Sequence, residues 1–247
     1  MTTRLLLAAV LLSAQLCEGQ GSVGPGIFAL RTMLTDKNPE IRIKAAEGLG
    51  RVGGRQSVII LRQGLSDKDL GVRVAVVEAL GFVGGRLAMT VLSEALKDRS
   101  AEVRLRSVEA LKDAGTINSI PIIQKAFGDN EESVRLHAAL MLRKIGNRRA
   151  VPVLGKVALD DKSPAVRGAA AEYLGKVGVK DRRTVGILAK ILQDKSPTVR
   201  IRAIESLGFL QLREAIPVLE TALEDRDAGV RIRATEVIGH VLAKDFE

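Results

Sequence analysis

A short motif recurs along the whole chain and limits what the chain can fold into. A valine or isoleucine followed by arginine occurs seven times, and an aspartate stands six residues before each of these arginines. Successive copies are 31, 31, 31, 32, 33 and 31 residues apart. The aspartates are Asp36, Asp67, Asp98, Asp129, Asp161, Asp194 and Asp225, and the arginines are Arg42, Arg73, Arg104, Arg135, Arg167, Arg200 and Arg231. Self-similarity at this period predicts a stack of equivalent units rather than one closed core.

Each repeat has the pattern of two helices. The first is short and apolar, as in residues 57–65, 119–127 and 215–223. The second follows an Asp-containing turn, opens at a residue suited to cap a helix and, in five repeats, ends at a glycine suited to a left-handed cap. These glycines are Gly53, Gly84, Gly115, Gly146 and Gly178. The pattern predicts an all-α solenoid of about seven helical hairpins, with repeats at residues 25–53, 54–84, 85–115, 116–146, 147–178, 179–211 and 212–243.

The position of the motif arginine on its helix predicts burial. Counted from the valine or isoleucine, the residues 4, 8 and 11 positions later form one apolar stripe, and the arginine lies against it. A partly buried arginine needs an anionic partner, and the turn aspartates of its own or a neighbouring repeat supply one. We therefore expect a ladder of charge-assisted hydrogen bonds along the stack, with a structural rather than a catalytic role.

Two copies carry the fullest form of the pattern, DKSPTVRIRAIESLG and DKSPAVRGAAAEYLG. They resemble the HEAT-like repeat named after the phycobilisome lyases, and the resemblance extends over about residues 25–243. It implies an armadillo/HEAT-like α-solenoid whose second helices line a concave surface. The family includes bilin lyases, iron-dependent deoxyhypusine hydroxylase and binding scaffolds, so the resemblance is specific for the fold and not for one function.

The sequence holds no constellation that predicts catalysis, a cofactor or a metal. The iron-binding relatives hold their metal with His-Glu pairs, whereas here no His-Glu dipeptide occurs and His137 and His240 are three repeats apart. No nucleotide-binding loop or nucleophile elbow is present. One helical position holds glutamate in six repeats, and cations three residues before four of them favour a salt-bridged surface; a row that binds cations or basic peptides is the alternative. These residues are Glu47, Glu78, Glu109, Glu172, Glu205 and Glu236.

Residues that depart from the repeat are candidates for binding a partner. Leu140 replaces the glutamate of the fourth repeat, with His137 and Lys144 beside it on the same helical face. Phe82 and Phe209 occupy one equivalent position in the second and sixth repeats. Exposed apolar side chains on a groove can anchor a partner, although these two could instead pack against adjacent helices.

Charge is predicted to differ between the two edges of the stack. The loops between repeats carry a row of cations, a predicted basic rim: Arg55, Arg86, Arg148, Arg149, Lys180, Arg182, Arg183 and Arg213. The opposite edge, with the Asp turns, is predicted to be acidic. The formal net charge of +9 permits an anionic partner, but one tyrosine, five phenylalanines and no tryptophan leave few platforms for stacking bases, so nucleic acid is disfavoured.

The first residues have the pattern of a secretory signal. Arg4 precedes eight apolar residues, and Cys17 and Gly19 suit a cleavage site after residue 19. We therefore interpret residues 1–19 as a signal peptide and 20–247 as the solenoid. An uncleaved anchor or an N-terminal core helix is the alternative, and the only membrane contact expected is through an uncleaved signal.

These observations favour an exported, non-catalytic scaffold that binds a protein through its concave face, with an acidic segment suited to the basic rim. The alternatives are a bilin lyase- or hydroxylase-like enzyme and a binder of anionic polymer or nucleic acid through that rim. The last helix keeps the apolar pattern of an interior repeat, with Val230, Ile232, Val237 and Ile238. Terminal repeats usually present a polar surface, so we expect this end to dimerise or dock.

Overall fold

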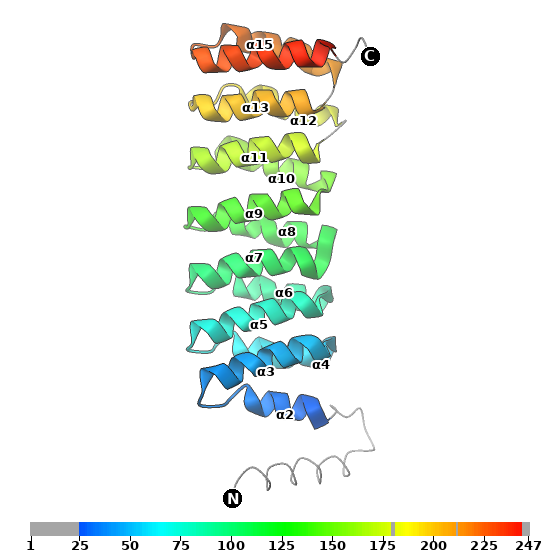
Figure 1. Ribbon diagram of the computed structural model, residues 1–247, viewed down its shortest axis with the longest axis vertical. Coiled ribbons are helices and arrows are strands. Elements are labelled where there is room, and N and C mark those ends of the chain that lie inside the picture. The colour runs from blue at the N-terminus through cyan, green and yellow to red at the C-terminus, as the bar shows by residue number, and fades with distance from the viewer. Residues whose placement is uncertain (1–24, 179–180, 211, 244–247) are drawn as a thin grey trace, which may run out of the picture. The chain divides into compact units, whose positions relative to one another are not determined.

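The computed structural model describes residues 25–178, 181–210 and 212–243 (Figure 1). The described residues form 14 α-helices and short 3-10 helices, without a strand. The all-α class and the helical-hairpin repeat are therefore as the periodicity predicts. The predicted signal at residues 1–19 lies outside the described residues. The chain divides into two compact units after Gly115, at the end of the third predicted repeat.

The first unit is described over residues 25–115. Its helices are α2 (Pro25–Met33), α3 (Pro39–Val52), α4 (Gly54–Gly64), α5 (Leu70–Val83), α6 (Gly85–Ala95) and α7 (Ala101–Gly115). Helices α3, α5 and α7 lie side by side in one layer, with α4 and α6 behind them (Figure 1). Each helix of the front layer follows an Asp turn and carries the repeated arginine.

The second unit is described over residues 116–178, 181–210 and 212–243. Its α-helices are α8 (Ile120–Ile123), α9 (Glu132–Ile145), α10 (Val151–Asp160), α11 (Pro164–Val177), α12 (Arg182–Ile191), α13 (Pro197–Leu210), α14 (Ile216–Thr221) and α15 (Ala228–Ala243). Its 3-10 helices are η1 (Thr116–Ser119), η2 (Gln124–Gly128), η3 (Arg148–Ala150), η4 (Arg213–Ala215) and η5 (Ala222–Glu224). Helices α9, α11, α13 and α15 form the front layer (Figure 1).

The core of each unit lies between the two layers and along the seams of the front layer. Leucines eight positions after the motif valine or isoleucine are completely buried, for example Leu49 and Leu80 in the first unit and Leu174 and Leu207 in the second. Burying each such leucine contributes about 2 kcal/mol to the stability of the fold. The predicted apolar stripe is thus the core face, except that Val52 at the end of α3 is exposed.

Small residues bring neighbouring helices of the front layer close together. In the first unit a Cβ atom on Gly81 would lie 3.0 Å from the Cβ of Ala110. In the second unit a Cβ on Gly175 would lie 2.7 Å from the Cα of Ser206. Main chains that approach this closely leave no room for a side chain, so glycine at the seam sets the spacing of α11 and α13.

Helix ends differ in two respects from the sequence-based expectation. Gly146 adopts the left-handed cap, whereas Gly53 and Gly84 have positive φ with extended ψ, and Gly178 has φ of −91°. Glycine is required at position 178 because a Cβ there would collide with Thr184. The apolar segments at 119–127 and 215–223, predicted to be single helices, are split into a short α-helix and 3-10 turns.

Candidate functional site

The motif arginines of the first unit join consecutive Asp turns. Arg42 Nε donates to Asp67 Oδ2 at 2.6 Å and its Nη2 donates to Oδ1 at 2.8 Å. Its Nη1 donates to the main-chain oxygens of Asp36 at 2.8 Å and Lys37 at 3.2 Å. Arg73 pairs with Asp98 in the same way. One guanidinium therefore fixes the turn of its own repeat through carbonyls and that of the next repeat through a carboxylate.

The second unit repeats this geometry three times. The Nε to Oδ2 distances are 2.9 Å for Arg135–Asp161, 2.6 Å for Arg167–Asp194 and 2.7 Å for Arg200–Asp225. The five paired arginines of both units are only 2–5% exposed. Arg104 donates to the main chain of Asp98, and Asp129 accepts from the main chain of Glu131. The terminal members, Asp36 and Arg231, are considered below.

The ladder lowers the pKa of three of its carboxylates, those of Asp67, Asp194 and Asp225, which favours their charged form. Partial burial raises the pKa of Asp67, but hydrogen bonds from Arg42 and from the main chain outweigh it and hold this pKa below the ordinary value. Asp194 shows the same balance with Arg167. For Asp225 the hydrogen bond from Arg200 is the largest effect, and the pKa is again lowered. Carboxylates that stay ionised at neutral pH can hold the turns in place, but they are poorly suited to transfer protons near neutral pH.

The repeated glutamates lie on the exposed face of the front layers, and five of the six are paired with cations. In the first unit Lys44 Nζ lies 3.0 Å from Glu47, and Arg106 lies 3.4 Å from Glu109, while Glu78 is exposed. In the second unit the pairing runs across three helices, from Lys176 on α11 to Glu236 on α15. Its distances are Lys176–Glu172 2.6 Å, Arg202–Glu172 3.7 Å, Arg202–Glu205 3.1 Å, Arg233–Glu205 3.4 Å and Arg233–Glu236 2.9 Å.

This chain of alternating charges borders a hollow on the exposed face of α11, α13 and α15, which we call the front hollow. It has a volume of about 670 Å³. Phe209, 55% exposed, stands in it, with Gly208 and Val237 beside it and His240 at its edge. Gly208 carries no side chain because a Cβ there would lie 2.7 Å from Val237 Cγ1. The front hollow therefore combines an exposed aromatic ring with charges of both signs.

The other residues that depart from the repeat are not brought into the front hollow. Phe82 lies on α5 of the first unit and is 87% exposed. On α9 of the second unit, Leu140 and His137 are half-buried and Lys144 is exposed. Both phenylalanines thus expose more than half of their surface, Phe82 more than Phe209. Of the two, Phe209 stands in a hollow.

The loops between repeats expose most of the cations predicted there. These are Arg55 and Arg86 in the first unit and Arg148, Arg149, Arg182, Arg183 and Arg213 in the second. Lys180 lies outside the described residues. Arg182 pairs with Glu214 at 2.8 Å, and Arg183 pairs with Asp181 at 2.8 Å and lowers the pKa of that carboxyl. Part of this charge is therefore neutralised locally.

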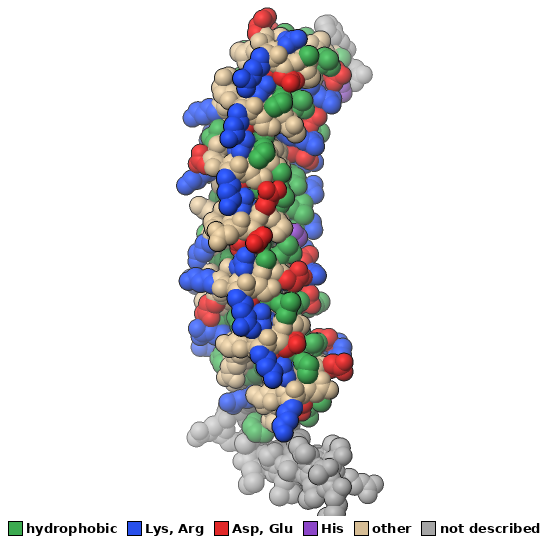
Figure 2. Space-filling model, turned by 90° about the vertical axis from the view of Figure 1, so that its left-hand side faces the viewer, with side chains coloured by type: hydrophobic (Ala, Val, Ile, Leu, Met, Phe, Trp, Pro, Cys, Tyr) green, Lys and Arg blue, Asp and Glu red, His purple; other side chains and the backbone are tan. Residues whose placement is uncertain are grey.

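The Asp-turn edge is not the acidic rim that the count of aspartates suggests. The ladder aspartates are mostly buried against arginines, and the side chain that directly follows each is exposed. In six of seven repeats that next residue is a cation: Lys37, Lys68 and Arg99 in the first unit, and Lys162, Lys195 and Arg226 in the second. Figure 2 faces this edge and shows lysine and arginine side chains among acidic ones. The sequence contains this signal, a Lys or Arg after the repeated Asp, but the prediction overlooked it.

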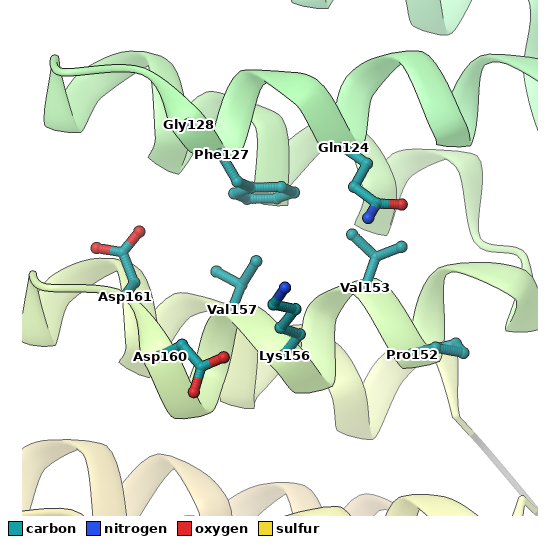
Figure 3. A pocket seen from close by; sticks show the side chains of 9 residues that line it. All are labelled: Gln124, Phe127, Gly128, Pro152, Val153, Lys156, Val157, Asp160 and Asp161. Carbon is teal, nitrogen blue, oxygen red and sulfur yellow. The ribbon is translucent and has the colours of Figure 1, made fainter.

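A second hollow lies on the rear layer of the second unit, between α10 and the η2 turn. Its volume is about 400 Å³. Phe127 points across it toward Val153 and Val157, and Lys156 and Asp160 lie near Val157 on α10 (Figure 3). Its lining comes from the η2 turn and from α10, two consecutive first helices, so we interpret it as an opening of the rear layer.

Two further features bear on function. Among the described residues, no group of three or more His, Cys, Asp or Glu side chains could hold a metal ion. Within that part of the chain, no helix has the length and apolar character needed to cross a membrane.

Comparison with known proteins identifies the repeat through a family model. A family model described as HEAT repeats matches residues 28–112, 89–175 and 153–239. No curated protein matches the chain. The solved complex of CpcE and CpcF of phycocyanin lyase from Nostoc is 23% identical, with a TM-score of 0.49, over 61% of this chain and 97% of that chain. Human deoxyhypusine hydroxylase in complex with glycerol is 19% identical, with a TM-score of 0.43, over 97% and 92%. Escherichia coli YibA is 23% identical, with a TM-score of 0.48, over 86% and 92%.

Proposed function

We propose that this chain, which belongs to the family of HEAT-repeat proteins, is a non-catalytic scaffold that binds a protein partner in the front hollow. The observation that carries the proposal is Phe209, an aromatic ring exposed in a hollow of about 670 Å³. A large apolar side chain gains most from burial when it stands in a depression that a partner can fill. Aromatic side chains surrounded by polar groups are typical of the centre of a protein interface.

The charges around Phe209 support binding over acid–base catalysis. Glu172, Glu205 and Glu236 are each paired with at least one cation. General acid–base chemistry needs two groups whose environments push their pKa values apart. A row of alternating charges instead suits a segment that carries an apolar anchor flanked by charged residues, because each flanking charge finds an opposite charge beside the hollow.

We also propose that the partner's flanking segment is acidic. The formal net charge of the chain is +9, and the exposed cations of the loops between repeats, Arg149 and Arg213 among them, follow the C-terminal ends of front-layer helices, where Phe209 lies on α13. Contacts between exposed charges are screened by salt. Partner binding should therefore weaken as NaCl rises from 50 to 300 mM, on the order of tenfold; binding that ignores salt would contradict this part of the proposal.

The binding site is tested by affinity capture with matched variants. The full chain, Phe209→Ala and Leu159→Ala are used as baits in an extract of the cells that produce the chain. Leu159 is the control because it is also an exposed apolar residue of the second unit, on α10. We expect a protein that the full chain and Leu159→Ala retain and Phe209→Ala loses. Equal retention by all three would place binding elsewhere.

We propose that the scaffold acts outside the cytoplasm, because residues 1–19 have the pattern of a cleaved secretory signal. The chain isolated from cells should then begin at Gln20. An N-terminal sequence starting at Met1 would overturn the cleavage, and recovery from the cytoplasmic fraction alone would overturn export.

A further inference from the structure

Inside each unit, the second helix of a hairpin has one face that is buried by the following hairpin. This face carries the motif arginine and the residue four positions after it. In the first unit Ala46 and Val77 occupy the latter position, and in the second unit Ala139, Ala171 and Ile204 do so; all five are completely buried. The face thus joins one repeat to the next through a bidentate ion pair and an apolar contact.

At α15 this face is open. Arg231 and Thr235, which correspond to Arg200 and Ile204 one repeat earlier, are exposed. Ile232 is 60% exposed, and Leu242 is exposed farther along the helix. Arg231 Nη1 donates to the main-chain oxygen of Asp225 at 2.7 Å, as in the other repeats. Among the described residues no carboxylate pairs with this guanidinium, so the next rung of the ladder is unfilled.

The opposite face is open at α2 and α3. Ile41 is 37% exposed, whereas its equivalents in the other six repeats are completely buried. Asp36 Oδ1 accepts from the Asn38 main chain at 2.8 Å, and no arginine of the described chain reaches its carboxylate. Phe28 and Met33 of α2 are exposed beside it. A hollow of about 470 Å³ lies here, lined by Leu30, Met33, Glu40, Ile41, Ile43, Lys44 and Ala45.

We propose that the α15 end of one copy binds the α2–α3 end of a second copy, head to tail. In this contact Arg231 pairs with Asp36 of the second copy as Arg200 pairs with Asp225 within the chain, and Ile232 packs against the second copy's Ile41, as position 168 of α11 faces Val199 within the chain. The contact continues an interface the chain already makes between its own repeats. It leaves two different free ends, so it can generate open chains or rings.

A symmetric contact between two copies of α15 fits the surface less well. It would bring two Arg231 guanidiniums to one face without a carboxylate for either, and unpaired charge at an interface disfavours association. The dimer through the last helix that the sequence suggests is thus replaced by an asymmetric contact. Phe209 lies on α13 and not on α15, so assembly and partner binding are tested by different variants.

Charge reversal at the two ends tests the pairing. The full chain, Asp36→Arg and Arg231→Asp are followed by sedimentation velocity over a range of concentrations. We expect the full chain to associate, and each single variant alone to associate about tenfold to hundredfold more weakly, because like charges then meet. An equimolar mixture of the two variants should regain the affinity of the full chain, since one contact joins the native pair and the other joins the reversed pair.

Three outcomes would overturn the proposal: a full chain that stays monomeric, single variants that associate like the full chain, or a mixture no stronger than its components. The first is the outcome expected if another segment of the chain covers either end. Ile232→Lys should weaken association, whereas Ile59→Lys, at an exposed isoleucine of α4, should not. Phe209→Ala should leave association unchanged, and circular dichroism checks that every variant is folded.

Discussion

At the scale of single residues, the repeated Arg–Asp pair decides the architecture. Arg42 is 5% exposed, and a guanidinium at that depth is stable only when all its donors find acceptors. Two donors meet the carboxylate of Asp67 and a third meets main-chain oxygens. Each pair therefore links one turn to the next, and its loss leaves an isolated buried charge.

Removing one ladder carboxylate should destabilise the fold far more than removing a neighbouring surface charge. We expect Asp67→Ala to lower the free energy of unfolding by about 3 to 5 kcal/mol, because Arg42 then remains buried without a counter-charge. Lys68→Ala, at the adjacent exposed position, should change it by less than about 0.5 kcal/mol. Urea unfolding of both variants measures the difference; equal effects would contradict a structural role for the pair.

The ladder also predicts the direction of acid unfolding. The pKa values of Asp67, Asp194 and Asp225 are lowered in the folded chain, so their contribution to stability is complete above the unfolded value of about 3.9 and is lost as the pH falls through the lowered values. The free energy of unfolding should be steady from about pH 7 to pH 5 and fall below about pH 4. Asp67→Ala should flatten that fall. A full chain as stable at pH 3 as at pH 6 would disprove the linkage.

At the scale of helices, the spacing of the front layer depends on glycines at the seams. Gly175 faces the main chain of Ser206 across the α11–α13 seam, and main chain cannot move aside as a side chain can. Gly186 on α12 has no atom within 4 Å of the position of an added Cβ. The two glycines of one unit therefore differ only in whether a neighbour occupies the space beside them.

A matched pair of substitutions separates packing from helix propensity. Gly175→Ala should destabilise the fold by about 1 to 3 kcal/mol, because the methyl group overpacks the seam. Gly186→Ala should stabilise it by roughly 0.5 to 1 kcal/mol, because alanine favours a helix without a clash. Thermal unfolding of both variants gives the comparison, and a Gly175→Ala variant as stable as Gly186→Ala would show that the seam is not tightly packed.

How far the sequence predicts these elements depends on what each feature needs. Periodicity suffices for the register of the helices and for placing Arg200 against the apolar core. It does not predict that the carboxylate for Arg200 comes from the next repeat, since that depends on how hairpins stack. Periodicity predicts that Gly178 is a left-handed helix cap. In the structure glycine is needed there because Thr184 approaches too closely to leave room for a Cβ atom. The front hollow depends on the spacing of three helices, which the sequence does not predict. From the sequence, Phe209 is a candidate only because it departs from the repeat.

At the scale of the whole molecule, the buried charges of the repeats pair with one another, so the residues that depart from the repeat are the candidates for function. The two compact units use the same ladder, and within each the buried groups are equivalent from repeat to repeat. What is unique lies on the exposed face, where Phe209 stands in the front hollow, and at the two ends, where Asp36 and Arg231 lack ladder partners among the described residues. These surfaces suit a scaffold that binds one protein and its own copies through separate sites.

Photo-cross-linking from position 209 shows most directly whether a protein partner occupies the front hollow. A chain in which p-benzoylphenylalanine replaces Phe209 is irradiated in the cells that produce it, beside a chain with the same replacement at Leu159. Both side chains are exposed in the second unit, so they sample solvent alike unless a partner occupies the front hollow. We predict a discrete protein adduct from position 209 and none from position 159. An adduct from position 159 alone, or no adduct from position 209, would contradict binding in the front hollow.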